Sequence, residues 1–223
     1  MIIQAMEDYL KAIHLLQKGN GKVSTSAIAQ QMGVSVPSAT NMIRKLAPMG
    51  LLDYISYYGV ELTDGGLKTA QAVVRHHRLL KLYLVEIMGF TWDKVHDEAD
   101  KLEHVISEEF EKKMEEALGN PTTDPHGHTI PAKDGDLKDV AYHTLGEVNP
   151  GSFVTVRQVN DDNPEMLRYL ANLRLAPGTV VQVVAKDPFN VPLLLRIDKT
   201  EQYVGREVGY NVFVELSKKR DAK

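Results

Sequence analysis

Apolar residues recur every three or four positions through the first fifty residues, a spacing typical of helices. The pattern predicts three helices, over residues 3–18, 26–32 and 37–49. The second and third are joined by Gly33-Val34-Ser35, and Pro37 falls in a first helical turn, where its missing N–H costs nothing. Two short β-rich runs around Gly59 then predict a hairpin. This order indicates a winged helix-turn-helix, although a glycine-linked helix pair also occurs in structural bundles.

The middle of the chain continues as helices, and the last third changes to a period of two. Three further helices are predicted over residues 65–88, 92–106 and 107–118, followed by a loop and linker rich in Pro, Gly and Asp over 119–151. Alternating positions then predict strands at 152–159, 179–187 and 192–198 and in the run 203–216, with a short helix at 164–173. About five short strands in this length favour a small closed barrel.

The expected fold is therefore mainly α with a β-barrel. At 223 residues the chain is longer than a single core usually requires. We expect three domains: a winged helix-turn-helix, a helical domain and a small barrel. Their expected bounds are residues 1–75, 76–145 and 146–223.

The composition narrows the chemistry that the chain can support. It contains no cysteine, which excludes disulfides, thiolate nucleophiles, iron–sulfur clusters and cysteine-ligated zinc. No stretch approaches the roughly 18 consecutive apolar residues that span a bilayer, and the first ten residues lack the basic and apolar regions of a signal peptide. We therefore expect a cytoplasmic protein that does not bind membranes.

Charge is unevenly distributed, although the net charge is only −4. Residues 1–75 contain seven lysines and arginines against five acidic residues, whereas residues 86–119 contain four against eleven. This asymmetry favours two partners of opposite sign. A solvated acidic helix face is the alternative explanation of the second block.

The acidic block contains a candidate metal site. On a helix, His96, Asp100, Glu103 and His104 would occupy positions i, i+4, i+7 and i+8 and project from one face. Stacked carboxylates repel each other unless a cation intervenes, and imidazoles with carboxylate oxygens form a ligand set for divalent metals. The alternative is a solvated acidic helix with two surface histidines. Further candidate ligands are Glu7-Asp8, His76-His77 and the loop from Asp124 to His128, for which a core-edge histidine and a simple turn are the alternatives.

Four ordered motifs carry a family resemblance: MEDYL, RHHRLLKLYL, KVHDEADKLEHV and PHGHTIP. Together they resemble the diphtheria-toxin-repressor/manganese-transport-regulator family of metal-dependent transcriptional repressors. The stretch VRQVNDDNPEMLRYLANLRLAPGTVVQVV resembles that family's C-terminal SH3-like, FeoA-type domain. The resemblance extends over nearly the whole chain. It implies that the three expected domains are a winged helix-turn-helix DNA-binding domain, a helical metal-binding and dimerisation domain, and a small SH3-like barrel.

The resemblance implies a primary metal site at Asp8, Asp100, Glu103 and His104, with His77 close by. In iron-type members the first two positions are methionine and cysteine, whereas both are aspartate here, as in manganese-type members. Oxygen ligands suit hard ions such as Mn²⁺, which favours Mn(II) as the cofactor, with Fe(II) as the alternative.

Two lysines depart from the family pattern. Lys11 stands where short manganese-type members have a glutamate, which argues against a two-metal cluster. Lys81 stands where longer members have a glutamate of an ancillary site, and a protonated ammonium cannot bind metal. An ancillary site could still form from His77 with further residues; alternatively, Lys81 replaces that metal by pairing with acidic residues. The further ancillary candidates are His96, Asp124, His126, Asp161 and Asp162.

The second helix of the helix–turn–helix is expected to enter the major groove of DNA with its N-terminal residues at the base edges. Asn41 can pair with adenine, and Pro37 and the Thr40 methyl can contact thymine methyl groups. The full set of expected DNA-binding residues is Thr25, Ser35, Pro37, Ser38, Thr40, Asn41, Arg44, Lys45 and Tyr57, with Lys22 and Tyr58 as further phosphate contacts. Ordinary helix surface is the alternative for each polar residue.

These features together predict a manganese-responsive repressor that binds a palindromic operator as a homodimer and controls metal-uptake genes. An iron(II)-responsive repressor and a metal-independent winged-helix regulator are the alternatives. A metallohydrolase is a third, because His76-His77 and His96-Asp97 loosely match a phosphohydrolase pattern, but the chain lacks a Gly-rich or basic phosphate cradle. We therefore expect no enzymatic activity.

Overall fold

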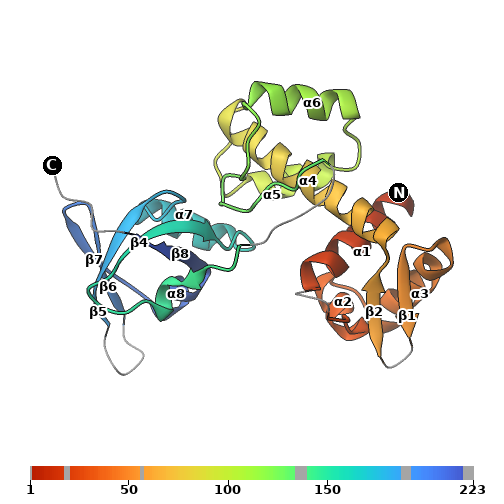
Figure 1. Cartoon of the computed structure of the whole chain (residues 1–223), viewed down its shortest axis with the longest axis horizontal. Coiled ribbons are helices and arrows are strands. Elements are labelled where there is room, and N and C mark those ends of the chain that lie inside the picture. Colours follow the sequence, from red (N-terminus) through yellow and green to blue (C-terminus); the bar gives the residue numbers. More distant parts are fainter. Residues whose placement is uncertain (1, 18–20, 56–57, 134–139, 187–191, 218–223) are drawn as a thin grey trace. The chain divides into compact units, whose positions relative to one another are not determined.

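The computed structural model describes residues 2–17, 21–55, 58–133, 140–186 and 192–217 (Figure 1). It divides into two compact units, and each is described by itself. The first unit comprises residues 1–80, 99–117 and 130–137, and the second comprises residues 81–98, 118–129 and 138–223. The expected three-domain division follows different boundaries and stays a prediction.

The first unit contains the expected winged helix-turn-helix. Its elements are α1 (Ile2–Leu16), α2 (Thr25–Gln31), α3 (Val36–Leu46), the 3₁₀ turn η1 (Ala47–Met49), β1 (Leu52–Ile55) and β2 (Gly59–Leu62). Leu10, Ile13, Ile28, Ile43 and Leu46 are buried in one apolar cluster, so the helical stripes that the sequence predicts do form the core. The strands β1 and β2 pair antiparallel, as a wing requires.

Local signals set the limits of α3. The Ser35 hydroxyl accepts the Ser38 backbone N–H at 3.3 Å, which caps the helix, and proline follows in the first turn. The helix was predicted to continue to Met49, but it ends at Leu46 and passes into η1. Pro48 lacks the N–H that would continue the α-helical ladder, and Gly50 then adopts a left-handed conformation.

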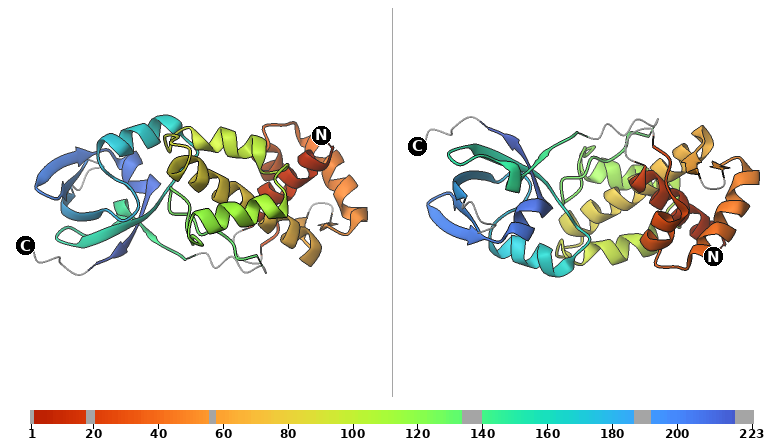
Figure 2. Two further views of the ribbon diagram at one scale, coloured as in Figure 1. Left: turned by 90° about the horizontal axis from the view of Figure 1, so that it is seen from above. Right: turned by 90° about the horizontal axis from the view of Figure 1, so that it is seen from below.

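The long helix α4 (Asp64–Glu86) begins in the first unit and ends in the second. Its start lies so close to the preceding turn that a Cβ on Gly66 would come within 1.8 Å of the Leu51 carbonyl oxygen, so glycine is required there. Helix α6 (Glu108–Ala117) lies beside α4 (Figures 1 and 2). The buried Arg75 Nε donates to Glu111 Oε1 at 2.5 Å across this contact.

The helix that was predicted over residues 92–106 is shorter in the structure. Helix α5 spans only Val95–Leu102, and residues 103–105 form a turn. The Glu103 N–H still donates to the Ala99 carbonyl oxygen at 2.9 Å, so the turn continues directly from the helix. The predicted face of four stacked side chains is therefore wrong for Glu103 and His104, which are positioned by this turn.

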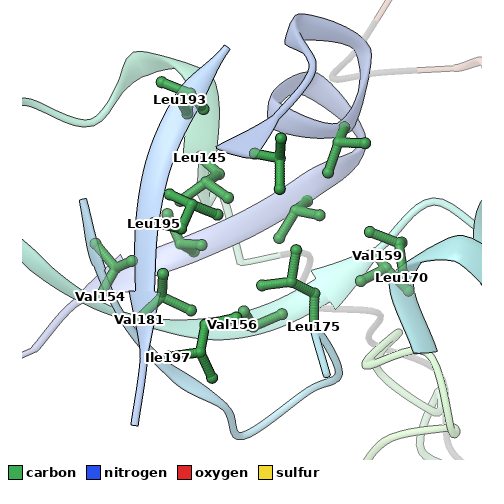
Figure 3. Close-up of a cluster of buried hydrophobic side chains, with 14 of the residues drawn as sticks. Leu145, Val154, Val156, Val159, Leu170, Leu175, Val181, Leu193, Leu195 and Ile197 are labelled. Carbon is green, nitrogen blue, oxygen red and sulfur yellow. The ribbon is translucent and has the colours of Figure 1, made fainter. Parts of the chain in front are cut away.

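The second unit contains a six-stranded antiparallel sheet around one apolar core, which includes Val156, Val181 and Leu195 (Figure 3). The strand order is β3-β8-β4-β5-β6-β7, with β3 and β7 at the edges. The strands are β3 (His143–Thr144), β4 (Phe153–Val159), β5 (Val180–Lys186), β6 (Leu193–Ile197), β7 (Thr200–Val204) and β8 (Val212–Leu216). The turn η2 (Leu145–Glu147) follows β3.

Two short helices complete this unit. Helix α7 (Pro164–Asn172) confirms the predicted helix between the first two long strands, and the Asn163 side chain caps it. The run 203–216 was predicted as strand, but α8 (Arg206–Asn211) separates β7 from β8, with Gly205 at its N-cap. Among the described residues, no helix is long and apolar enough to cross a membrane.

Candidate metal centre and DNA-binding surface

Three side chains from two elements converge in the first unit, and we call Asp8, Glu103 and His104 the first cluster. Asp8 comes from α1, and the other two come from the turn after α5. His104 Nε2 lies 2.9 Å from Asp8 Oδ1 and 3.4 Å from Glu103 Oε1. One ligand atom of each residue lies within 4.8 Å of the others, which is the spacing of a group that could hold a metal ion.

Glu7 fixes the orientation of the His104 ring. His104 Nδ1 lies 2.6 Å from Glu7 Oε2, so Nδ1–H donates to this carboxylate. The other ring nitrogen, Nε2, lies at hydrogen-bond distance from Asp8 Oδ1 and is the atom that would face a metal ion. This carboxylate–histidine arrangement is typical of metal sites, where it fixes the tautomer and strengthens the ligand. Sequence reasoning noted Glu7 beside Asp8 but gave it no separate role.

The first cluster brings two carboxylates close together. Burial raises the pKa of Asp8, and the neighbouring charge of Glu103 raises it further, while His104 opposes the shift. Glu103 is only 1% exposed, so water screens its charge poorly. A divalent cation would relieve the repulsion between these two carboxylates. With two oxygens and one imidazole nitrogen as donors, the cluster fits a divalent metal of the hard or borderline class.

The remaining residues of the expected primary site, His77 and Asp100, lie with Glu103 around the ammonium of Lys11. Its Nζ donates to both Glu103 carboxylate oxygens at 2.9 Å and to Asp100 Oδ1 at 3.0 Å. His77 Nδ1 lies 2.6 Å from Glu103 Oε2 and 3.1 Å from Asp100 Oδ1. The five expected primary residues are therefore divided: Asp8, Glu103 and His104 converge, while His77, Asp100 and Glu103 surround an ammonium.

The charge of Lys11 changes the electrostatics of that half. Burial alone would raise the pKa of Asp100, but the hydrogen bond from His77 and the charge of Lys11 outweigh it and lower the pKa below its usual range. Asp100 therefore remains ionised and paired without a metal ion. An ammonium thus occupies the position that a second cation would need.

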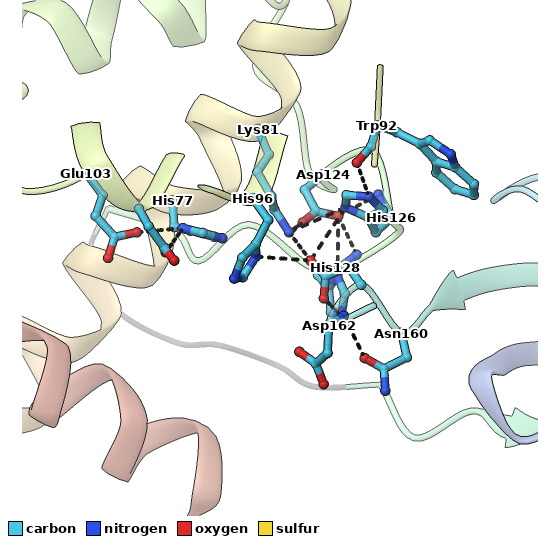
Figure 4. Close-up of polar contacts among 12 residues, drawn as sticks. His77, Lys81, Trp92, His96, Glu103, Asp124, His126, His128, Asn160 and Asp162 are labelled. Atoms are coloured by element: carbon cyan, nitrogen blue, oxygen red, sulfur yellow. Dashed lines mark hydrogen bonds and ion pairs between the residues drawn. The ribbon is translucent and has the colours of Figure 1, made fainter. Parts of the chain in front are cut away.

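In the second unit, Lys81, Asp124, His126 and Asp161 form what we call the second cluster (Figure 4). The Lys81 ammonium is 2% exposed and lies 2.5 Å from Asp124 Oδ2 and 2.6 Å from Asp161 Oδ2. His126 Nδ1 lies 3.5 Å from the same nitrogen. His96 Nδ1 lies 4.0 Å from Asp161 Oδ2.

The loop at residues 124–128 owes its shape to Asp124 and Gly127. Asp124 Oδ1 accepts the backbone N–H groups of His126 and His128, both at 2.9 Å, while its other oxygen faces Lys81. A Cβ on Gly127, whose φ is +88°, would lie 1.9 Å from the Arg157 carbonyl oxygen. The loop is thus a hydrogen-bonded turn, as the alternative interpretation held, and it also contributes to the cluster. Asp162 is exposed, and Figure 4 shows its carboxylate turned away from Lys81.

The burial of His126 can be tested by measuring how stability depends on pH. Desolvation, together with the charge of Lys81, lowers the pKa of His126 to about 4. The unfolded chain protonates this histidine below about pH 6.5, whereas the folded chain does so only near pH 4, so the free energy of unfolding should decrease as the pH falls between these values. We expect a loss of about 3 kcal/mol, measured by urea titration of Trp92 fluorescence at pH 7 and pH 4.5.

The control for that titration is the exposed His143. A His126→Gln variant should lose most of the pH dependence, and His143→Gln should retain it. An unchanged slope in His126→Gln would show that another group carries the effect.

The helix–turn–helix presents most of the expected DNA-binding residues to solvent. Ser35, Pro37, Ser38, Asn41, Arg44 and Lys45 are exposed, and Thr25 and Thr40 are half-buried. The Thr40 hydroxyl donates to the Val36 carbonyl oxygen at 2.8 Å, so its methyl group is the part that remains for external contact. Lys22 and Tyr58 are exposed, and Tyr57 lies outside the described residues.

A winged helix-turn-helix, a carboxylate–histidine cluster that could hold a metal and an SH3-like sheet define the class of metal-dependent transcriptional repressors. Three family models match the chain in order. They are the N-terminal DNA-binding domain of iron-dependent repressors at residues 1–60, the metal-binding and dimerisation domain of these repressors at 63–132, and the FeoA domain at 143–216.

Full-length comparisons agree with these models. The iron-dependent repressor IdeR of Mycobacterium leprae (strain TN) is 30% identical over 206 residues, which cover 87% of this chain and 90% of that relative. A solved manganese-dependent transcriptional repressor in complex with manganese is 36% identical, with a TM-score of 0.86 and coverage of 95% and 100%. The solved manganese regulator SloR is 30% identical, with a TM-score of 0.74 and coverage of 95% and 98%. The chain therefore belongs to the iron-dependent repressor family, which confirms the resemblance to the diphtheria toxin repressors.

Proposed function

We propose that this chain is a manganese-responsive repressor that binds palindromic operator DNA as a homodimer and controls metal-uptake genes. The observation that carries the proposal is the first cluster, in which Asp8 of α1 meets Glu103 and His104 beyond α5. A metal ion bound there would supply the positive charge that draws the carboxylates together. The proposed domains are those expected from the sequence, residues 1–75, 76–145 and 146–223, acting in the cytoplasm.

The preference for manganese rests on the ligand chemistry. Asp8 and Asp100 stand where, by family resemblance, iron-type members have methionine and cysteine, and Asp8 is the one of the two that lies in the first cluster. Mn²⁺ is the weakest binder in the divalent series, so a site must select it by hard ligands and geometry. The same donors accept Fe(II), which remains the second candidate cofactor.

The switch works by adding a metal bridge between Asp8 and Glu103, beside the ion pair that Lys11 of α1 already makes with Glu103. Asp8 belongs to α1 in the DNA-binding part, and Glu103 belongs to the turn after α5, in the part proposed to form the dimer. Bridging their charges would fix α1 and, with it, the position of α3. In a homodimer, two α3 helices could then enter successive major grooves about 34–36 Å apart. A metal that binds the fixed state about 10⁴-fold more tightly would convert a minor population into the dominant one.

Mobility-shift assays with metal and chelator test this function. We expect Mn²⁺ to support retardation of an operator fragment and the chelator to abolish it, with a dimer as the bound species. Equal retardation under both conditions would support a metal-independent regulator instead. Turnover of a model phosphodiester with added metal would favour the hydrolase, which the named relatives, described as repressors or regulators, do not suggest.

Asn41 should contribute to the choice of operator sequence. We expect Asn41→Ala to weaken operator binding by about 5- to 150-fold, since a bidentate side-chain contact with a base contributes about 1–3 kcal/mol. Lys45→Ala is the matched comparison, because a phosphate contact should weaken binding equally on all sequences and reduce the salt dependence. Binding to a panel of single-base operator variants separates the two effects. If Asn41→Ala weakened binding to all operator variants equally, Asn41 would have no role in recognising the base sequence.

A further inference from the structure

We propose that the second cluster is a site filled by the chain's own cation, in which the Lys81 ammonium takes the place of a metal ion. Its residues come from three segments: Asp124 and His126 from one loop, Asp161 from the segment after β4, and Lys81 from α4. This inference goes beyond the proposed function and does not depend on it. Its consequence is that the link between α4 and the segment after β4, made by Lys81 and Asp161, does not respond to the supply of metal.

The first argument is that two carboxylates and an imidazole surround the ammonium. Lysine has three N–H donors. Three acceptors surround Lys81: Asp124 Oδ2 at 2.5 Å, Asp161 Oδ2 at 2.6 Å and His126 Nδ1 at 3.5 Å. His126 Nε2 lies 2.9 Å from the Trp92 carbonyl oxygen and donates to it, so Nδ1 carries the lone pair that faces Lys81. Lys81 therefore donates to Asp161 Oδ2 and to His126 Nδ1 and forms an ion pair with Asp124 Oδ2, and the tautomer of the histidine matches.

The second argument is the cost of replacing the ammonium. Burial by itself would lower the pKa of Lys81, but the charges of Asp124 and Asp161 outweigh burial and raise it. The lysine therefore remains protonated at neutral pH. A metal ion in this position would have to expel a proton from Lys81 or lie beside an ammonium at hydrogen-bond distance from the same oxygens. Like charges this close in a buried site are strongly unfavourable.

The third argument is that the donor set otherwise has the composition of a metal site. Asp124, His126 and Asp161 each direct one ligand atom to a common point, with all three within 4.8 Å of one another. The lysine supplies the cation that these donors require. The residues present thus do not fit a metal ion as long as Lys81 remains.

Trp92 is the single tryptophan of the chain and reports on this site directly. Its ring stacks on His126 with centroids 5.4 Å apart and planes inclined by 18°. A paramagnetic ion bound to His126 would quench the Trp92 fluorescence. Ions bound at the first cluster are counted separately, by equilibrium dialysis.

The experiment titrates the full chain with Mn²⁺ while Trp92 emission and bound metal are recorded together. For the wild type we expect no quenching of Trp92 fluorescence, even at Mn²⁺ concentrations at which equilibrium dialysis shows the first cluster to be saturated. For Lys81→Glu, which replaces the ammonium with a carboxylate, we expect one additional ion per chain and quenching that follows it. Lys94→Glu, at an exposed lysine in the turn between α4 and α5, is the matched control and should behave as the wild type. Quenching in the wild type in step with a bound ion would overturn the proposal.

A second measurement does not require Lys81→Glu to fold. Hydrogen exchange of residues 159–163 in the metal-free wild type should remain slow in chelator, because the link is internal. Asp161→Asn retains the shape of the side chain and Lys81 but removes one charge, and it should accelerate exchange there by at least tenfold. Chelator-induced exchange in the wild type, or an unchanged rate in Asp161→Asn, would contradict the resident-cation site.

Discussion

An Asp8→Met variant should need at least about 100-fold more Mn²⁺ than the wild type for half-maximal operator binding. Asp8 contributes one of the two carboxylates that face His104 Nε2, at 2.9 Å. Mutation of residues that only hydrogen-bond to metal ligands already lowers metal affinity roughly 10- to 100-fold, so the loss of a ligand should lower it further. The shift is measured by retardation of a labelled operator across buffered Mn²⁺ concentrations.

The same variant tests why the site would prefer manganese. A thioether is a softer ligand than a carboxylate, so Asp8→Met should bring the response to Fe(II), assayed without oxygen, above the response to Mn²⁺. Asp97→Met is the matched control, because Asp97 is exposed on α5 and should leave both responses unchanged. An unchanged order of metals in Asp8→Met would refute the hard-ligand argument, and an unchanged Mn²⁺ midpoint would remove Asp8 from the site.

Lys11→Glu should increase the number of Mn²⁺ ions bound at the first-unit site from one per chain to two. Lys11 Nζ contacts both oxygens of Glu103 and one of Asp100, so its removal frees those oxygens. A glutamate there adds a further carboxylate beside His77, which together form an oxygen-rich set for a second hard ion. Without metal, the extra negative charge increases repulsion, so the variant should be less stable in chelator and gain more from Mn²⁺.

Equilibrium dialysis counts the ions, and thermal unfolding with and without Mn²⁺ measures the stability change. Lys112→Glu on the solvent side of α6 has the same change of charge without access to the cluster and should still bind one ion. Trp92 fluorescence should remain unquenched, which distinguishes this added ion from one at the second cluster. A single ion in Lys11→Glu would show that the ammonium is not what excludes the second one.

The order of elements could be predicted because local signals agree with the tertiary fold. The hydroxyl of Ser35 and the proline two residues later mark the start of α3, and the structure uses both. The early end of α5 at Leu102 has no such signal, because the apolar pattern continues beyond it. There the carboxylate of Glu103 makes long-range contacts with Lys11 and His77 that the local pattern does not contain. The α8 helix was missed because its six residues are too few to establish a helical period.

The candidate site was predictable in its residue types and less so in their grouping. Asp8, Glu103 and His104 were expected together, and they converge. His77 and Asp100 lie around Lys11 and apart from the first cluster. This grouping depends on the contact between Lys11 and Asp100, which are 89 positions apart, and a sequence pattern cannot specify such a contact. Lys81 and Asp161 are 80 positions apart, and only the fold reveals that the ammonium lies at the centre of its group.

Both clusters consist of oxygen and nitrogen donors only, and the chain has no cysteine. Peroxide converts thiolates to sulfenic and higher acids, which removes them as ligands. A regulator built like this one offers peroxide no thiolate target in its sensing groups. Its response to metal should therefore persist during oxidative stress, when a repressor that depends on a thiolate ligand would release its operator.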